Sequence, residues 1–151
     1  AGTIEGNARQ KASFIHKKYG FNCFSEDTGL EVEALNQAPG IFSARYAGPQ
    51  KRSEDNIKKL LKELSGQENR RARFRTVICL ILDKREHIFE GIIKGKISET
   101  PAGESGFGYD PVFIPEGFLS SFAQMDLTQK NQISHRSVAF SKMIDFLRSQ
   151  K

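Results

Sequence analysis

The stretch Arg73–Asp83 (RFRTVICLILD) constrains the fold more than any other part of the chain. Its first residues alternate between polar and apolar side chains, and the rest of the stretch is continuously apolar. This pattern predicts a β-strand that is buried on both faces. After a short turn at 84–86, residues 87–97 are predicted to return as its antiparallel partner, with Gly91 and Gly95 as β-bulges. The chain therefore needs a sheet that is covered on both sides.

Three helices are predicted around this hairpin. Thr3, Ser53 and Ser134 are each suited to begin one, because a hydroxyl or a first-turn acid satisfies free N–H groups there. The expected buried stripes are Ala8, Ala12, Ile15 and Tyr19; Ile57, Leu60, Leu61 and Leu64; and Phe140, Met143, Ile144 and Leu147. Further short strands are expected at 21–25 and 111–115. Interspersed helices and strands predict an α/β or α+β protein with a mixed sheet.

Length and composition indicate a soluble globular protein with one domain, residues 1–151, or one domain with two lobes. The chain has 151 residues, of which 38% are hydrophobic and 27% are charged. No apolar run is long enough for a membrane span, and no signal peptide is expected. Cys23 and Cys79 lie far apart in apolar runs. We interpret them as buried thiols in a reducing compartment, and we predict a cytoplasmic protein without a membrane partner.

The positive charge of the chain is concentrated in residues 51–75. Lys and Arg total 23 and Asp and Glu 18, which gives a net charge of +5. Such a field favours anionic partners in general. We interpret the stretch as a solvated helix face with a basic loop; the alternative is a rim that attracts phosphate.

Acidic residues form the first candidate site. Glu26 and Asp27 follow the short predicted strand at 21–25 and precede Gly29. Carboxylates at the carboxyl end of a strand lie where α/β proteins bind ligands, and Mg²⁺ is often held by one or two carboxylates plus substrate phosphates. The alternative is an acidic turn in which the aspartate caps a backbone amide.

Two further segments suit a nucleotide. Glycines flank Phe107, so the backbone can approach a planar ligand and the ring can stack on a base; the alternative is a core aromatic in a tight turn. Lys130 and the helix start at Ser134, His135 and Arg136 would suit an anion, because cations in a first helical turn are otherwise disfavoured. The alternative is a capped helix with exposed basic side chains. The segment containing Arg45 supports either a cleft residue or a surface loop.

Five stretches of the chain, in order, resemble the inosine/xanthosine triphosphate pyrophosphatases, which cleanse nucleotide pools. They are Thr3–Ala8 with Lys11; 25–35; 38–40 with 43–48; Gly106–Pro111; and Ile133–Arg136. The resemblance implies hydrolysis of ITP, dITP or XTP to the monophosphate and pyrophosphate. It also implies Mg²⁺, a homodimer, and an α/β fold with a long mixed central sheet flanked by helices and a cleft between two lobes.

The same resemblance implies roles for individual residues. Asp27 is the implied general base and metal ligand, and Glu26 is the companion acid of the metal site. The implied substrate contacts are Lys11, Thr28, Phe107, Gly108, Tyr109, Asp110, Lys130, His135 and Arg136. Phe107 would stack on the base. Cationic donors would form hydrogen bonds with a 6-oxo group but not with a 6-amino group, which is itself a donor. We therefore expect Asp27, Phe107 and Arg136 to face one groove.

The sequence departs from the family pattern in two ways. Glu26 stands where the family usually has aspartate. The family also begins with a strand, a Thr/Ser-x-Asn-x-x-Lys phosphate loop and a metal-ligating glutamate, which this sequence lacks. An alternative is therefore a purine-nucleotide-binding fragment without turnover. A basic nucleic-acid-binding module is a third hypothesis, although the acids at 26–27 would repel a phosphate backbone and no stable nucleic-acid partner is expected.

Overall fold

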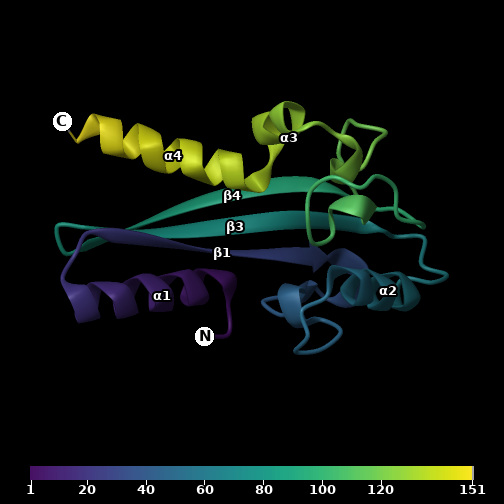
Figure 1. Ribbon diagram of the computed structural model, residues 1–151, viewed down its shortest axis with the longest axis horizontal. Coiled ribbons are helices and arrows are strands. Elements are labelled where there is room, and N and C mark those ends of the chain that lie inside the picture. The colour runs from purple at the N-terminus through teal and green to yellow at the C-terminus, as the bar shows by residue number, and fades with distance from the viewer. Residues whose placement is uncertain (151) are drawn as a thin grey trace.

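A five-stranded sheet lies between two layers of helices in the computed structural model, which describes residues 1–150 (Figure 1). The strands are β1 (Cys23–Val32), β2 (Ala38–Gly40), β3 (Arg71–Leu82), β4 (Arg85–Ile97) and β5 (Phe113–Pro115). The helices are α1 (Ile4–Tyr19), α2 (Ser53–Glu63), α3 (Leu127–Ile133) and α4 (His135–Ser149). Short 3₁₀ helices occur at 33–35, 43–45, 110–112 and 122–124. The expected α/β class, with a long central sheet flanked by helices, is confirmed.

All strand pairings within residues 1–150 are antiparallel, whereas we expected a mixed sheet. The strand order is β2-β1-β3-β4-β5. Val32 at the end of β1 lies opposite Ala72 at the start of β3, so the segment that connects them leaves and returns at the same end of the sheet. Such a connection makes its two strands antiparallel.

Strand β1 is longer than predicted and contains the acidic residues instead of ending at them. It pairs with β3 from Cys23 to Val32 without interruption. Its second half is anchored because Leu30 and Val32 are fully buried. Glu26 and Asp27 therefore lie in the middle of a strand, and the predicted acidic turn is wrong.

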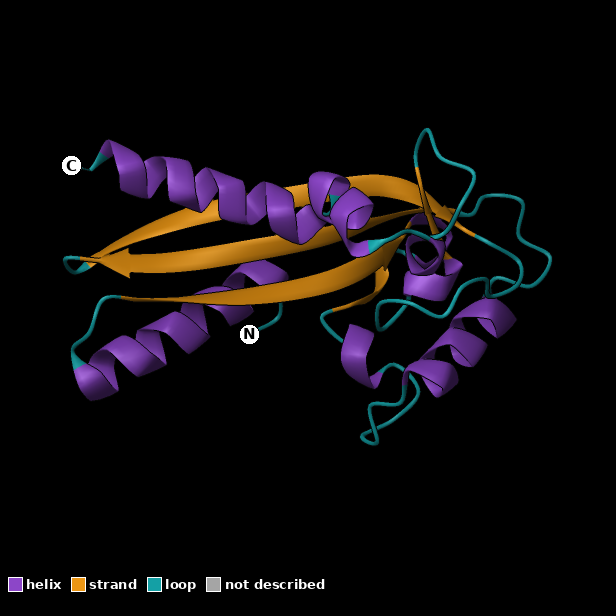
Figure 2. Ribbon diagram, turned by 45° about the horizontal axis from the view of Figure 1, so that its top comes forward, coloured by secondary structure: helices purple, strands orange, loops and turns teal. Residues whose placement is uncertain are grey.

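Helices cover both faces of β3, as the apolar stretch predicted. Ala8 and Ala12 of α1 pack on the face that carries Val77, whereas Ala139 of α4 packs on the face that carries Ile78. Figure 2 shows α1 and α4 on opposite sides of the long strands. Because side chains alternate along a strand, neighbouring residues of β1 also face different helices.

The predicted helix starts are largely confirmed. Thr3 accepts a hydrogen bond from the Gly6 amide at 2.9 Å, and Ser134 accepts one from Ser137 at 3.2 Å. Helix α2 begins at Ser53 but has no side-chain cap. The predicted stripes are too wide, since four of their members are exposed at the surface: Ile15, Tyr19, Ile144 and Leu147. Helix α3 is an element that we did not predict.

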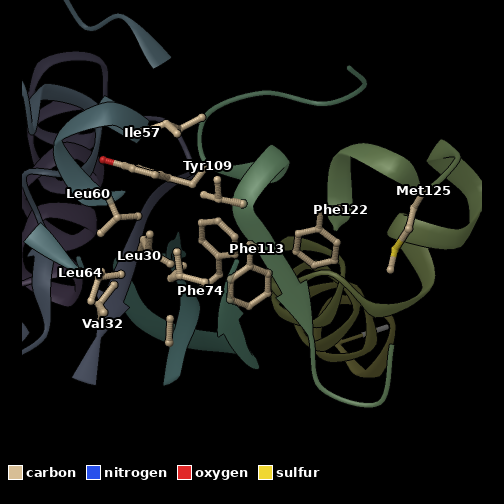
Figure 3. Close-up of a cluster of buried hydrophobic side chains, with 13 residues drawn as sticks. Leu30, Val32, Ile57, Leu60, Leu64, Phe74, Tyr109, Phe113, Phe122 and Met125 are labelled. Atoms are coloured by element: carbon tan, nitrogen blue, oxygen red, sulfur yellow. The ribbon is translucent and has the colours of Figure 1, made fainter. Parts of the chain in front are cut away.

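A second core lies at the opposite end of the sheet from α1. Phe74 of β3 packs against Phe113 and Phe122, with ring centroids 4.5 and 6.0 Å away (Figure 3). Leu60 of α2 and Leu64, directly after this helix, complete the cluster from the other side. It supports the loop 106–112 and the start of α4, where most of the predicted site residues lie.

Gly91 and Gly95 are not bulges, because β3 and β4 pair residue for residue from Arg71 to Leu82. Instead, each glycine permits a close approach of another segment. A Cβ at Gly91 would overlap the carbonyl oxygen of His135 and lie 2.7 Å from the Ala139 nitrogen. The glycine therefore lets the first turn of α4 rest directly on the sheet.

Several of the basic residues of 51–75 have structural partners. Arg73 forms an ion pair with Glu31 at 2.7 Å, and Arg75 forms one with Glu90 at 2.6 Å. Arg70 donates to three backbone carbonyls. These contacts favour a structural role over a nucleic-acid surface. None of the helices within residues 1–150 has both the length and the apolar character that crossing a membrane requires.

Candidate functional site

A hollow of about 580 Å³ lies between β1, the loop 106–110 and the starts of α3 and α4. Eight of the predicted substrate contacts line it: Thr28, Phe107, Gly108, Tyr109, Asp110, Lys130, His135 and Arg136. We call it the central hollow. Sequence positions more than a hundred residues apart are therefore brought to one place, as the resemblance implied.

Phe107 is held at the mouth of the hollow by its backbone, and its ring remains accessible. The Asp110 carboxylate accepts a hydrogen bond from the Phe107 amide at 3.0 Å. The same carboxylate is nearly fully buried and pairs with Lys130 Nζ at 2.6 Å. Gly106 and Gly108 have φ angles of +79° and +61°, which favour glycine. Phe107 is 61% exposed, so its ring is available for stacking on a planar ligand.

Tyr109 and Thr28 form walls of the hollow through buried hydrogen bonds. The Tyr109 hydroxyl donates to the Ser43 carbonyl at 2.6 Å, and burial raises the pKa of this phenol, so it remains a donor. Thr28 Oγ1 lies 2.8 Å from Thr76 Oγ1 of β3. In the segment 43–48, it is Ser43 that contacts the wall, whereas Arg45 is exposed.

The first turn of α4 presents two different nitrogen groups. Arg136 has its guanidinium carbon 5.0 Å from the centre of the Phe107 ring, where Lys130 Nζ also lies at 4.7 Å. His135 is buried and stacks on Phe74 with ring centroids 4.7 Å apart. Its Nδ1 atom is buried without a hydrogen-bond partner within the described chain. A polar ligand in the hollow would satisfy this atom.

His135 is held in its neutral form. Burial is the main cause, and the charges of Arg136 and Lys130 add to it; together they lower the pKa of the imidazole to about 3. A neutral imidazole has one N–H donor and one acceptor nitrogen. The hollow therefore combines two basic side chains with one neutral group that can both donate and accept.

The neutral state of His135 predicts a dependence of stability on pH. As pH falls through the ordinary histidine range, the unfolded chain gains a proton that the folded chain does not accept until about pH 3. Stability from this group is therefore present above about pH 6.5 and declines as pH falls. Between pH 7.5 and 5 we expect the free energy of unfolding to fall by about 2 kcal/mol more in the wild type than in His135→Gln. Denaturant titrations across this range measure the difference; parallel pH profiles would contradict it.

Asp27 lies on the other face of the sheet, outside the central hollow. Its carboxylate accepts a hydrogen bond from Asn7 Nδ2 at 3.2 Å and lies 3.6 Å from Lys11 Nζ. Lys11 also donates to the Glu26 carbonyl oxygen. Both partners belong to α1. Our expectation that Asp27 would share a groove with Phe107 is wrong, because β1 continues as a strand through this position.

Glu26 and Asp27 do not meet at one ion. The Glu26 carboxylate points toward α4, where Oε1 lies 3.1 Å from Arg136 Nε, whereas Asp27 points toward α1. Within residues 1–150, no three His, Cys, Asp or Glu side chains are grouped closely enough to hold a metal. The joint metal site expected from these two neighbours is thus not formed. A single carboxylate at Asp27 still fits Mg²⁺ that is held mainly by substrate phosphates.

A second hollow, of about 760 Å³, lies at the far end of the sheet beside Arg71, Lys94 and Phe118. It is larger than the central hollow, but it contains none of the predicted site residues. Its size alone therefore does not make it the candidate site.

The chain is similar to known proteins over nearly its whole length. The model of the Ham1 family matches residues 1–146. This chain belongs to the Ham1 family. A dITP/XTP pyrophosphatase of Flavobacterium psychrophilum is 54% identical over 149 residues, which are 99% of this chain and 78% of the relative. One of Porphyromonas gingivalis is 56% identical over 148 residues, 97% of this chain and 76% of the relative.

Solved structures of Ham1 proteins have the same fold as this chain. The Ham1 protein of Staphylococcus aureus superposes with a TM-score of 0.97 at 42% identity, over 100% of this chain and 79% of that one. A Ham1 protein of Coxiella burnetii gives 0.95 at 36% identity, over 99% and 78%. Strand β1, whose side chains face α1 and α4 in turn, is therefore part of a fold that these Ham1 proteins share.

Sequence reasoning missed three residues around the site of this Ham1 chain. Asn7 contacts Asp27, Thr76 contacts Thr28, and Gly91 lies under the start of α4. Asn7 is four residues before Lys11 on α1, so helical spacing places the two side chains on one face and was the available signal. Thr76 gave a weaker signal, as a hydroxyl within an otherwise apolar strand.

Proposed function

We propose that this chain hydrolyses non-standard purine nucleoside triphosphates (ITP, dITP and XTP) to the monophosphate and pyrophosphate. The central hollow carries the proposal, since it combines an accessible aromatic ring, two cations and a neutral histidine in a chain 54% identical to a dITP/XTP pyrophosphatase. We assign the activity to a single domain, residues 1–151. Members of the Ham1 family with that name act on triphosphates with 6-oxo bases, which are the ligands that this donor set suits.

The base would be selected in the central hollow. Phe107 offers a stacking surface, and such stacking contributes about 1–3 kcal/mol per base. A 6-oxygen can accept hydrogen bonds from Arg136, Lys130 and one nitrogen of His135. A 6-amino group would leave these donors unpaired, and unpaired buried donors give strong discrimination. Thr28, Gly108, Tyr109 and Asp110 would complete the walls around the base.

The reaction would take place beside Asp27. We assign this carboxylate the role of general base, which takes a proton from the attacking water. Asn7 and Lys11 would hold it in place, and the Lys11 ammonium would also attract phosphate. Mg²⁺ bound at Asp27 would neutralise charge on the phosphates. Glu26, which points away from Asp27, has no part in this metal site.

The proposed positions of the base and the phosphates lie on opposite faces of β1. Thr28 and Asp27 are adjacent in this strand, so their side chains face opposite sides. A base in the hollow and phosphates beside Asp27 are therefore separated by the thickness of one strand.

Measurement of pyrophosphate release tests this function. With Mg²⁺ we expect kcat/KM for ITP, dITP and XTP to exceed that for ATP by about 10²-fold or more, because ATP lacks the 6-oxygen. Equal turnover of ITP and ATP, or release of inorganic phosphate in place of pyrophosphate, would contradict the proposal. Binding of inosine nucleotides with no turnover would support the binding-only alternative instead.

The resemblance also supports a homodimer. The two cysteines, which form no disulfide within the described residues, support a reducing compartment such as the cytoplasm. Light scattering of the purified chain tests the homodimer. A monomer mass at working concentration would contradict that part of the proposal.

A further inference from the structure

Glu26 lies beside the central hollow and faces the side chain that enters the hollow from the start of α4. Its Oε1 atom is 3.1 Å from Arg136 Nε, and both side chains are partly buried. The Asp27 carboxylate is on the opposite face of β1 with α1 partners of its own. Glu26 is therefore separated from the place where phosphates and metal would act.

Arg136 needs a carboxylate partner because of where it sits. It is the second residue of α4, where the positive end of the helix disfavours a cation. Lys130 Nζ lies over the same Phe107 ring, so two positive groups share one aromatic face. Lys130 is neutralised by Asp110 at 2.6 Å. Glu26 is the corresponding partner of Arg136.

The contact made by Glu26 also decides which nitrogens of Arg136 remain free. The carboxylate forms an ion pair beside Nε, although Nε makes no hydrogen bond within the described residues, and the terminal nitrogens of the guanidinium are left for another acceptor. An arginine that is held by an ion pair and covered by a ring loses less conformational freedom when it binds a ligand. The arrangement is that of a preorganised donor aimed at the hollow.

We propose that Glu26 is a positioning residue that holds Arg136 for recognition of the purine base, and that it is not a metal ligand. The inference rests on the proposed function, because it concerns the same site. It predicts that loss of the Glu26 charge weakens nucleotide binding through Arg136 and leaves the chemistry at Asp27 intact.

Calorimetry with inosine monophosphate and no metal tests the inference on the full chain. We expect Glu26→Gln to raise Kd about fivefold, the upper end of what a partly exposed ion pair contributes. The matched control is Glu31→Gln, which breaks a 2.7 Å arginine pair on the same strand but on the opposite face. This control should leave Kd unchanged. An unchanged Kd in Glu26→Gln, or no binding of the monophosphate by the wild type, would overturn the inference.

Two further measurements separate positioning from a general structural effect. In an Arg136→Gln background, Glu26→Gln should change Kd less than about twofold, because the partner is already absent. In the pyrophosphate assay, Glu26→Gln should raise KM for ITP while kcat and the half-saturating Mg²⁺ concentration stay at wild-type values. A raised Mg²⁺ requirement with normal monophosphate binding would show a metal ligand and overturn the inference.

Failure of the inference can be told apart from failure of the proposed function. Monophosphate binding requires neither metal nor turnover, so it reports on Glu26 even in a chain that releases no pyrophosphate. Where Glu26→Gln does not fold, Glu26→Asp retains the charge with a side chain one methylene shorter. We expect Glu26→Asp to weaken binding as well, because the shorter side chain would not reach Arg136. Wild-type affinity in Glu26→Asp would overturn the inference.

Discussion

Replacement of Asp27 by asparagine is expected to lower kcat for ITP hydrolysis by about 10²–10⁴-fold, the usual effect of losing a general base. Asparagine keeps the size of the side chain and can still contact Asn7 and Lys11, but it cannot accept the proton. Since Asp27 lies on the face away from the hollow, we expect the Kd for inosine monophosphate to change by less than about twofold. Steady-state kinetics and metal-free calorimetry measure the two effects separately.

Asp83→Asn is a suitable control for this substitution. Asp83 is exposed in the turn between β3 and β4, and its φ of +51° is one that asparagine adopts readily. The control should retain wild-type kcat. Normal turnover in Asp27→Asn would show that another group is the base. Loss of monophosphate binding in the same variant would show that the base does not bind in the central hollow.

Gly91→Ala is expected to damage both stability and binding. The new methyl would overlap the His135 carbonyl and crowd the Ala139 nitrogen, which are backbone atoms that no side-chain rotation can move aside. Overpacking of this kind costs about 1–3 kcal/mol, and relief requires a shift of α4. Because the first turn of α4 carries His135 and Arg136, we also expect the Kd for inosine monophosphate to rise at least about tenfold.

Chemical denaturation and calorimetry measure these two effects of Gly91→Ala. Gly2→Ala is the control, since a Cβ at Gly2 would meet nothing within 4 Å. If Gly91→Ala retained wild-type stability and affinity, α4 would not rest on β4 as described.

The sequence predicted the elements better than it predicted their ends. The apolar stretch of β3, its hairpin partner and the three long helices were correct because their periodicity is strong. Strand β1 was cut short because Glu26, Asp27 and Gly29 look like a turn when only local propensity is considered. Its ten-residue ladder with β3 overrides that propensity, and a tertiary pairing of this kind leaves no local pattern.

Eight of the residues that the motif resemblance named line the central hollow, and they come from four separate segments. The geometry around Asp27 was not predicted. The resemblance could not reveal that Asp27 faces α1, since that follows from the alternation of a strand that we had ended too early. The contact between Glu26 and Arg136 was missed for the same reason. The role of Gly91 was missed because the glycine was interpreted as a bulge.

Glu26, proposed to position Arg136, and Asp27, proposed as the general base, are neighbours joined by a single peptide unit. Because Leu30 and Val32 anchor the later part of β1, a deletion or insertion of one residue between Thr28 and Leu30 would turn Glu26 and Asp27 each to the opposite face of the strand. The faces on which the Glu26 and Asp27 carboxylates lie are thus fixed by the number of residues between them and the anchored end of β1. Mutational libraries should vary the composition of this strand while its length is held constant.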